Sequence, residues 1–246
     1  MIAKTPKPPR VAIIRDYELN AEWGYEMLDS IRNCVLKAQP EAEIQNFQPI
    51  DGGDVPDAST FDLVILTGGT ADLTLPETDP WVTKVLDWIR DTVANSPTTK
   101  LLGICWGHQA ISRAMGGTIA YREDGPLIEV QNVPLTEQGR EFFKGYQSLR
   151  LHKFHRRMVK TAPPGFHYLA DNHEISMSDS EQMMTFQGHP EMTAHIAQGL
   201  VANKDGTYLP DPSPEGVARL NQALEKDEDG KKAFARVMAW AFDNKV

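Results

Sequence analysis

The amino-acid sequence predicts an α/β fold in which a doubly wound, mostly parallel sheet is flanked by helices. Residues 61–66 and 101–104 are almost continuously apolar, which is typical of parallel strands buried on both faces. Strand-like and helix-like segments also alternate along the first half of the chain, as in βαβ units. Between residues 118 and 186, short strand-like segments follow one another with few helices. This last pattern predicts a small antiparallel extension at one edge of the sheet.

The first half of the chain contains most of the predicted parallel core. Residues 1–9 are rich in proline and are expected to form a tail, and residues 10–246 are expected to form a single domain. An amphipathic helix is predicted at 21–38, because Trp23, Met27, Ile31 and Val35 recur on one stripe. Pro80 is expected to begin another helix, since its missing N–H would have no partner there. The other elements predicted here are strands at 11–15, 43–47, 61–66 and 101–104 and a helix at 110–115.

The second half of the chain is predicted to begin with strands and end with helices. The strands are expected at 118–121, 127–135, 166–170, 174–177 and 182–186, and the helices at 193–203, 215–224 and 231–242. The segment 205–214 contains three prolines. We expect it to be a surface connection and the most mobile part of the chain.

Composition and charge narrow the classes of function. The chain has 41% apolar and 24% charged residues, as ordinary globular proteins do. Its formal net charge of −9 argues against nucleic-acid binding, which needs clustered Lys and Arg. No apolar run reaches the length of a membrane span, and the N-terminus lacks the apolar core of a secretory signal. These features favour a protein of the cytoplasm.

The only two cysteines, Cys34 and Cys105, exclude a disulfide framework, and a reducing compartment would keep both thiols free. Cys34 lies in the predicted helix 21–38 and is expected to be a small buried core thiol.

One short segment is strongly basic, with six cationic or titratable side chains: His152, Lys153, His155, Arg156, Arg157 and Lys160. Two interpretations are open. The segment could be the solvated face of a hairpin, which we favour, or a contact for an anionic substrate or partner.

Cys105 occupies the most informative position of the chain. The apolar strand 101–104 stops abruptly at this cysteine, which has glycines two residues before and after it, and helix-like residues follow. A nucleophile at a sharp strand-to-helix turn is held above the sheet edge. The free N–H groups at the start of the helix favour a thiolate over a thiol. Cys105 is therefore a candidate nucleophile.

A base and its partner occur far downstream, where His189 and Glu191 stand two residues apart at another predicted strand end. A cysteine nucleophile needs a histidine to take or hold its proton, and the histidine needs an acceptor that fixes its ring. Functional residues gather at the carboxyl ends of parallel strands. The sequence thus predicts that Cys105, His189 and Glu191 meet there.

The two motifs around these residues resemble the signatures of the class I glutamine amidotransferase family. They are Gly-Ile-Cys-Trp-Gly-His-Gln at 103–109 and Gln-Gly-His-Pro-Glu at 187–191. The resemblance extends from residue 11 to at least residue 193. It implies a flavodoxin-like three-layer fold and hydrolysis of a γ-glutamyl amide through a γ-glutamyl thioester, with no cofactor.

The resemblance also implies roles for further residues. Residues 63–69 are similar to the family's strand and glycine loop, so the backbone N–H groups of Gly69 and Trp106 would form the oxyanion hole. Gln109 stands at the position that contacts the bound γ-glutamyl group. Residues 154–157 resemble the family's hairpin segment, but Arg157 stands where an Asp is common, which alters the surroundings of the substrate.

Two other uses of the motif residues are less favoured. His108 follows the nucleophile closely but is expected to be a packing or solvent histidine. Cys105, His108, His189 and Glu191 could be assembled into a zinc site, yet no further Cys or His pair stands at ligand spacing. We expect no metal.

The resemblance leaves the substrate and the partner open. The substrate is expected to be a small γ-glutamyl molecule, either glutamine or a γ-glutamyl peptide such as a glutathione-derived conjugate. Many family members pass ammonia to a synthetase, so this chain either serves a separate synthetase subunit or works alone. The other class of function is a catalytically silent binding or regulatory subunit. The complete set Cys105, His189 and Glu191 argues against that class.

Overall fold

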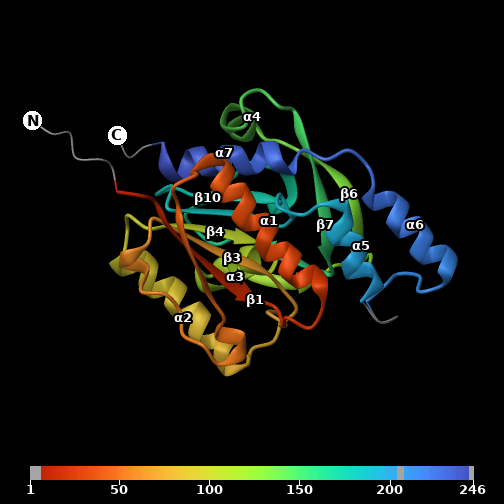
Figure 1. Ribbon diagram of the computed structural model, residues 1–246, viewed down its shortest axis with the longest axis horizontal. Coiled ribbons are helices and arrows are strands. Elements are labelled where there is room, and N and C mark those ends of the chain that lie inside the picture. Colours follow the sequence, from red (N-terminus) through yellow and green to blue (C-terminus); the bar gives the residue numbers. More distant parts are fainter. Residues whose placement is uncertain (1–6, 204–207, 244–246) are drawn as a thin grey trace, which may run out of the picture.

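A central seven-stranded sheet organises the chain in the computed structural model, which describes residues 7–203 and 208–243. The strand order is β2-β1-β3-β4-β11-β10-β9 (Figure 1). The parallel strands are β2 (Glu43–Phe47), β1 (Arg10–Asp16), β3 (Leu63–Gly69), β4 (Lys100–Ile104) and β11 (Met183–Phe186). Strands β10 (Ile175–Ser178) and β9 (Phe166–Tyr168) extend one edge in the antiparallel sense. The predicted doubly wound, mostly parallel sheet is confirmed.

Helices cover both faces of this sheet and create two hydrophobic cores (Figure 1). On one face lie α1 (Glu22–Ala38), α5 (Ala194–Ala202) and α7 (Gly230–Phe242), where Ile31 and Val237 are fully buried in the same core. On the other face lie α2 (Pro80–Asn95) and α3 (Trp106–Ala114), with Val85 and Ile111 in the second core. Strands β3 and β4 are buried between the two layers, which explains their almost continuous apolar sequence.

The remaining strands form two separate antiparallel pairs. Strand β5 (Thr118–Tyr121) pairs with β8 (Arg157–Thr161), and β6 (Leu127–Pro134) pairs with β7 (Ser148–His155). Helix α4 (Glu137–Phe142) connects β6 to β7, and α6 (Pro214–Leu224) lies beside β6. The family resemblance indicated a hairpin at 154–157, where β7 ends and β8 begins, but these strands pair with β6 and β5 and not with each other. The sequence did not indicate α4, and it did not show that β5 and β6 pair away from the central sheet.

Several boundaries differ from those expected. Helix α3 begins at Trp106, directly after Cys105, rather than at residue 110. Short 3-10 turns lie at η1 (Pro49–Asp51), η2 (Ala58–Thr60) and η3 (Asp171–His173). Residues 1–6 of the predicted tail and residues 204–207 of the predicted connection 205–214 lie outside the described residues. Within that connection, Tyr208 is half-buried and Leu209 is buried, so it also contributes to the core.

No helix in the described ranges is both long enough and apolar enough to cross a membrane.

Candidate active site

Cys105 lies at the sharp turn between β4 and α3. Its backbone has φ 51° and ψ −96°, in a region that residues other than glycine rarely adopt. The turn brings α3 very close to β3, because a Cβ on Gly107 would lie only 2.4 Å from the Leu66 carbonyl oxygen. Only glycine fits there. Such strain at a single residue is typical of a functional site, and the predicted strand-to-helix elbow is present.

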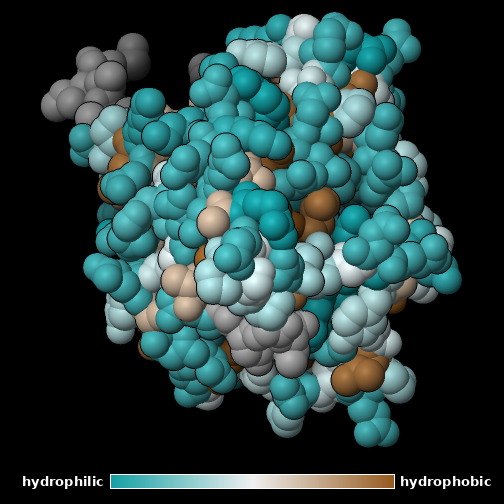
Figure 2. All heavy atoms as spheres, turned by 90° about the vertical axis from the view of Figure 1, so that its right-hand side faces the viewer, coloured by the Kyte–Doolittle hydropathy of each residue, from teal (hydrophilic) through white to brown (hydrophobic). Residues whose placement is uncertain are grey.

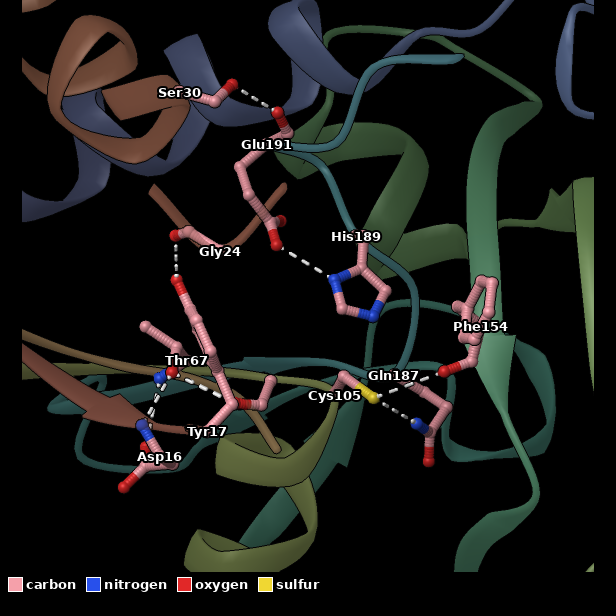
Figure 3. A network of polar contacts seen from close by, with 11 residues as sticks. Asp16, Tyr17, Gly24, Ser30, Thr67, Cys105, Phe154, Gln187, His189 and Glu191 are labelled. Carbon is pink, nitrogen blue, oxygen red and sulfur yellow. Dashed lines mark hydrogen bonds and ion pairs between the residues drawn. The ribbon is translucent and has the colours of Figure 1, made fainter. Parts of the chain in front are cut away.

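His189 and Glu191 follow β11, the strand beside β4, so they reach the same sheet edge as Cys105. Figure 3 shows the imidazole of His189 between the Glu191 carboxylate and the Cys105 sulfur. His189 Nδ1 lies 2.8 Å from Glu191 Oε1. Ser30 Oγ of α1 donates to the Glu191 carbonyl oxygen at 2.5 Å, which holds this segment against the helix. The three residues are therefore adjacent, as their positions at strand ends predict.

The electrostatics of His189 favour a charged imidazolium. Burial alone would lower the pKa of His189, but the charges of Glu191 and Cys105 and hydrogen bonds to both outweigh it and raise this pKa to about 10. His189 is 5% exposed and Glu191 is 2% exposed. Because both side chains are almost inaccessible to water, solvent screens the attraction between His189 and Glu191 only weakly. The geometry thus places a charged proton donor beside the Cys105 sulfur.

Two further groups contact the Cys105 sulfur. Gln187 Nε2 lies 3.8 Å from Sγ, and the Phe154 carbonyl oxygen lies 3.9 Å from it (Figure 3). Sequence reasoning gave Gln187 no role, although its place two residues before His189 in the second motif was a usable signal.

The glycine loop at the end of β3 lies beside this pair. A Cβ on Gly68 would be 3.0 Å from His189 Cε1 and 3.8 Å from Cys105 Cβ. A Cβ on Gly69 would lie 2.3 Å from the Asp16 carbonyl oxygen, so the loop is pressed against β1. Trp106 is the first residue of α3, and its backbone N–H therefore has no intrahelical acceptor. Gly69 lines the same pocket as Cys105, and Trp106 follows Cys105 directly. The roles of their N–H groups as oxyanion donors stay a prediction.

Gln109 is buried one turn into α3, and its amide is engaged within the protein. Its Nε2 donates to the Arg157 carbonyl oxygen at 2.9 Å and to Gln187 Oε1 at 3.1 Å. Gln109 is not among the described residues that line the pocket at Cys105. A contact between Gln109 and a substrate stays a prediction. The two hydrogen bonds of Gln109 connect the segment around Arg157 to Gln187.

The basic segment is not the solvated hairpin face that we favoured. His152, Lys153, His155 and Arg157 are each at most 5% exposed, while Arg156 is half-buried and Lys160 is exposed. The buried side chains have protein partners: His152 Nε2 donates to the Leu224 carbonyl oxygen, and Arg157 Nη2 to that of Thr70. Local sequence could not indicate this burial, because most of these partners are distant in the chain.

Lys153, which is fully buried, and Glu174, whose side chain is 15% exposed, form an ion pair beside the segment that carries His189. Burial lowers the pKa of Lys153 although Glu174 opposes this effect. The backbone beside each partner holds the segment that carries His189. The His189 N–H donates to the His152 carbonyl oxygen at 2.9 Å, and the Gln187 N–H donates to the Glu174 carbonyl oxygen at 2.9 Å. The pair thus joins β7 to the residue before β10, the two places that hold the segment of His189.

A pocket opens beside Cys105 and His189. Its other described lining residues come from the glycine loop, the β1–α1 region, β7 and the region of α5: Gly68, Gly69, Thr70, Tyr17, Trp23, Met27, Phe154, Leu200 and Tyr208. Apart from the loop, this lining is aromatic or aliphatic. The sequence did not indicate it, because it joins residues almost 200 positions apart.

Cys34 and His108 are not among the described residues that line the pocket at Cys105. Cys34 is only partly buried, contrary to our expectation of a core thiol, and burial raises its pKa to about 11. His108 is a packing histidine, 1% exposed, and burial lowers its pKa to about 3. In residues 7–203 and 208–243, no three His, Cys, Asp or Glu side chains gather as metal ligands.

Proteins of known family are similar to this chain over most of its length. The chain is 36% identical over 232 residues to the glutamine amidotransferase-like protein chry6 of Gibberella zeae, covering 94% of this chain and 95% of that protein. It is 27% identical to gamma-glutamyl peptidase 4 of Arabidopsis thaliana, covering 78% of each chain.

The fold is also that of a solved glutamine amidotransferase from Thermotoga maritima. The two structures have a TM-score of 0.73 at 19% sequence identity, and the alignment covers 94% of this chain and 96% of that one. The family model for glutamine amidotransferase class-I matches residues 23–204, which include Cys105, His189 and Glu191. The chain therefore belongs to the class I glutamine amidotransferase family.

Proposed function

We propose that the protein is a cysteine-dependent enzyme that hydrolyses the γ-glutamyl amide bond of a small molecule. The observation that carries the proposal is the buried His189 between Glu191 and Cys105, with its pKa raised to about 10. This arrangement supplies a nucleophile and a proton donor at the same place. A binding module needs neither.

In the first half of the reaction, the Cys105 thiolate attacks the γ-carbonyl carbon and forms a C–S bond. The backbone N–H groups of Gly69 and Trp106 are the proposed donors to the resulting oxyanion. Loss of one such donor costs roughly 3 kcal/mol in comparable sites. As the C–N bond breaks, His189 Nε2 gives its proton to the leaving nitrogen, which departs as a neutral amine. A γ-glutamyl thioester and a neutral imidazole remain.

In the second half, His189 takes a proton from water while the water oxygen attacks the thioester carbonyl. The C–S bond then breaks, glutamate leaves, and the thiolate and imidazolium are restored. General acid–base help of this kind contributes roughly 10²–10⁴ in rate. Glu191 keeps Nδ1 occupied, so that Nε2 is the nitrogen that exchanges the proton.

Covalent labelling tests the proposal directly. The intact protein is treated with a glutamine-analogue chloroketone, and its mass and the modified peptide are then measured. We expect one adduct, on Cys105, and hydrolysis of glutamine or another γ-glutamyl amide. Cys105→Ser should abolish both, and Cys34→Ser, which removes the other thiol, should leave both intact.

The alternative is a catalytically silent subunit of a synthetase complex. An unlabelled Cys105, under conditions that label a known glutaminase, would favour that alternative and reject the enzyme. A γ-glutamyl peptidase would cleave a substrate such as glutathione, whereas an ammonia-supplying subunit would cleave glutamine. Glutamine hydrolysis that rises on addition of a synthetase would support the separate partner.

A further inference from the structure

We infer that the preferred substrate carries an apolar or aromatic group on its leaving amine, an inference that rests on the function proposed above. The pocket beside Cys105 and His189 is lined mainly by aromatic and aliphatic side chains, as small-molecule sites commonly are. Ammonia, which glutamine would release, has no apolar surface to bury against such a lining, whereas an amine with an apolar or aromatic substituent has one.

One wall of the pocket is built by residues around the start of α1. The rings of Tyr17 and Trp23 are 5.2 Å apart, and Tyr17 Oη donates to the Gly24 carbonyl oxygen at 2.7 Å, which fixes its ring. Met27 continues the wall along the helix. A Cβ on Gly199 would lie 3.1 Å from Trp23 Cβ, so α1 and α5 meet closely here. This wall is preformed.

The opposite wall is also aromatic. Phe154 of β7 and Tyr208 are stacked with their ring centroids 5.5 Å apart and an interplanar angle of 16°. Tyr208 Oη donates to the Phe154 carbonyl oxygen at 3.4 Å. Leu200 of α5 lies among the same lining residues. The two walls come from four separate segments of the chain, yet both present apolar surface to the same space.

The lining of the pocket carries few charges, as expected for an apolar surface. Apart from Cys105 and His189, its described residues are uncharged, because burial raises the pKa values of Tyr17 and Tyr208 above the usual tyrosine range and keeps both hydroxyls neutral. A charged substituent would be desolvated there without a partner, whereas an apolar one would lose contact with water. Figure 2 shows the face on the side of α5 and α6 as mainly hydrophilic, so this face does not continue the lining as a broad apolar surface.

The position of the pocket relative to the reaction assigns it to the leaving group. The leaving nitrogen receives its proton from His189, so it must lie next to the imidazole. A substituent on that nitrogen then extends into the space that His189 shares with the apolar walls. The group on the far side of the scissile bond is therefore the one that these walls select.

The test compares γ-glutamyl benzylamide, γ-glutamyl 4-carboxybenzylamide and glutamine as substrates of the full chain. Benzylamine and ammonia have similar basicity, so a difference in rate reflects binding of the ring. We expect kcat/KM for the benzylamide to exceed that for glutamine by about tenfold or more, as for apolar groups in well-matched pockets. The carboxylated ring should lose this advantage.

Variants in the two walls link the preference to the pocket. Trp23→Ala and Leu200→Ala, on different helices, should each reduce the ratio of benzylamide to glutamine kcat/KM several-fold. Tyr25→Ala is the matched control, because Tyr25 is an aromatic residue of the same helix α1 but is 58% exposed. It should leave the ratio unchanged.

The outcomes separate the inference from the proposed function. Equal or lower kcat/KM for the benzylamide than for glutamine, or equal values for the neutral and carboxylated rings, would overturn the inference and leave γ-glutamyl hydrolysis intact. Failure of all three substrates together with an unlabelled Cys105 would instead reject the function and the inference with it.

Discussion

Replacement of Glu191 by glutamine measures how far a buried carboxylate drives the chemistry at Cys105. Glu191 Oε1 lies 2.8 Å from His189 Nδ1, and both residues are almost fully buried. Glutamine keeps the shape of the side chain but removes its charge. The imidazolium then loses its main stabilising partner, and the pKa of His189 should fall because burial disfavours the charged ring. We expect Cys105 to become less reactive.

The expected size of the effect follows from the hydrogen bond that is lost. A hydrogen bond to a charged group contributes about 1.5–3 kcal/mol. Since 1.36 kcal/mol corresponds to a factor of ten, the rate of Cys105 alkylation should fall roughly 10- to 150-fold. Turnover should fall further, toward the roughly 10⁴-fold loss known for the equivalent change in Ser-His-Asp enzymes. The glutamine amide can donate to Nδ1 and hold the wrong tautomer.

Alkylation by iodoacetamide is the assay, because it needs no knowledge of the substrate. The two cysteine-containing peptides are quantified by mass spectrometry across about pH 6 to 9. Cys34 is the internal reference, since burial raises its pKa to about 11 and keeps it a thiol across this range. In the wild-type protein Cys105 should react much faster than Cys34, and Glu191→Gln should slow Cys105 alone.

Glu26→Gln is the matched control for this experiment. Glu26 Oε1 lies 3.0 Å from His195 Nε2, so it forms a similar carboxylate–histidine contact, but the His195 side chain is 79% exposed. Such an exposed pair contributes little, and the control should behave as the wild type. If Glu191→Gln kept Cys105 alkylation and turnover within threefold of the wild type, the assignment of Glu191 as the residue that sustains the imidazolium would be refuted.

Three further changes test other parts of the structure. Gly107→Ala should destabilise the protein by about 1–3 kcal/mol, because its Cβ would meet the Leu66 carbonyl oxygen at 2.4 Å; a midpoint of urea unfolding equal to that of the wild type would contradict this packing. Lys153→Met should cost about 3–5 kcal/mol by leaving the Glu174 charge buried alone. The double variant with Glu174→Leu should recover most of that loss, and no recovery would argue against the ion pair. The raised pKa of His189 should make stability fall as pH increases from about 6.5, its usual unfolded value, through about 10, with the full contribution present below that range. Urea titrations of wild type and His189→Gln check this dependence, and parallel curves for the two proteins would exclude His189 as its source.

The proximity of Cys105, His189 and Glu191 was predictable from sequence because strand ends converge. Cys105 and His189 each follow a short apolar strand, and β4 and β11 are neighbours in the sheet. A parallel sheet places all such carboxyl ends at one edge. The proximity of Glu191 to His189 could be predicted without long-range information, because the two residues are only two positions apart. The sharp turn at Cys105 could be predicted because an apolar strand changes abruptly into a cysteine with nearby glycines.

The residues that surround this trio were not predictable, because their partners are distant in sequence. Lys153 belongs to a strongly basic segment, and nothing local indicates that Glu174 neutralises it in the interior. Tyr208 comes from a proline-rich stretch that suggests a surface connection, yet it stacks on Phe154 beside the nucleophile. Strand pairing is equally non-local: alternation in the sequence marks β6 as a strand but not β7 as its partner.

Arg157 shows why a departure from the family pattern can preserve the site. Its Nη2 donates to the Thr70 carbonyl oxygen at 2.7 Å, directly after Gly69, and its own carbonyl oxygen accepts from Gln109 Nε2 at 2.9 Å. Its Nη1 lies 3.3 Å from Asp72 Oδ1. An aspartate at 157 would face Asp72 and repel it, so this arginine and Asp72 form one unit. Through it, the start of β8 is bound to both the glycine loop and α3, and a shift of the hairpin would move the proposed oxyanion donor of Gly69 together with Gln109.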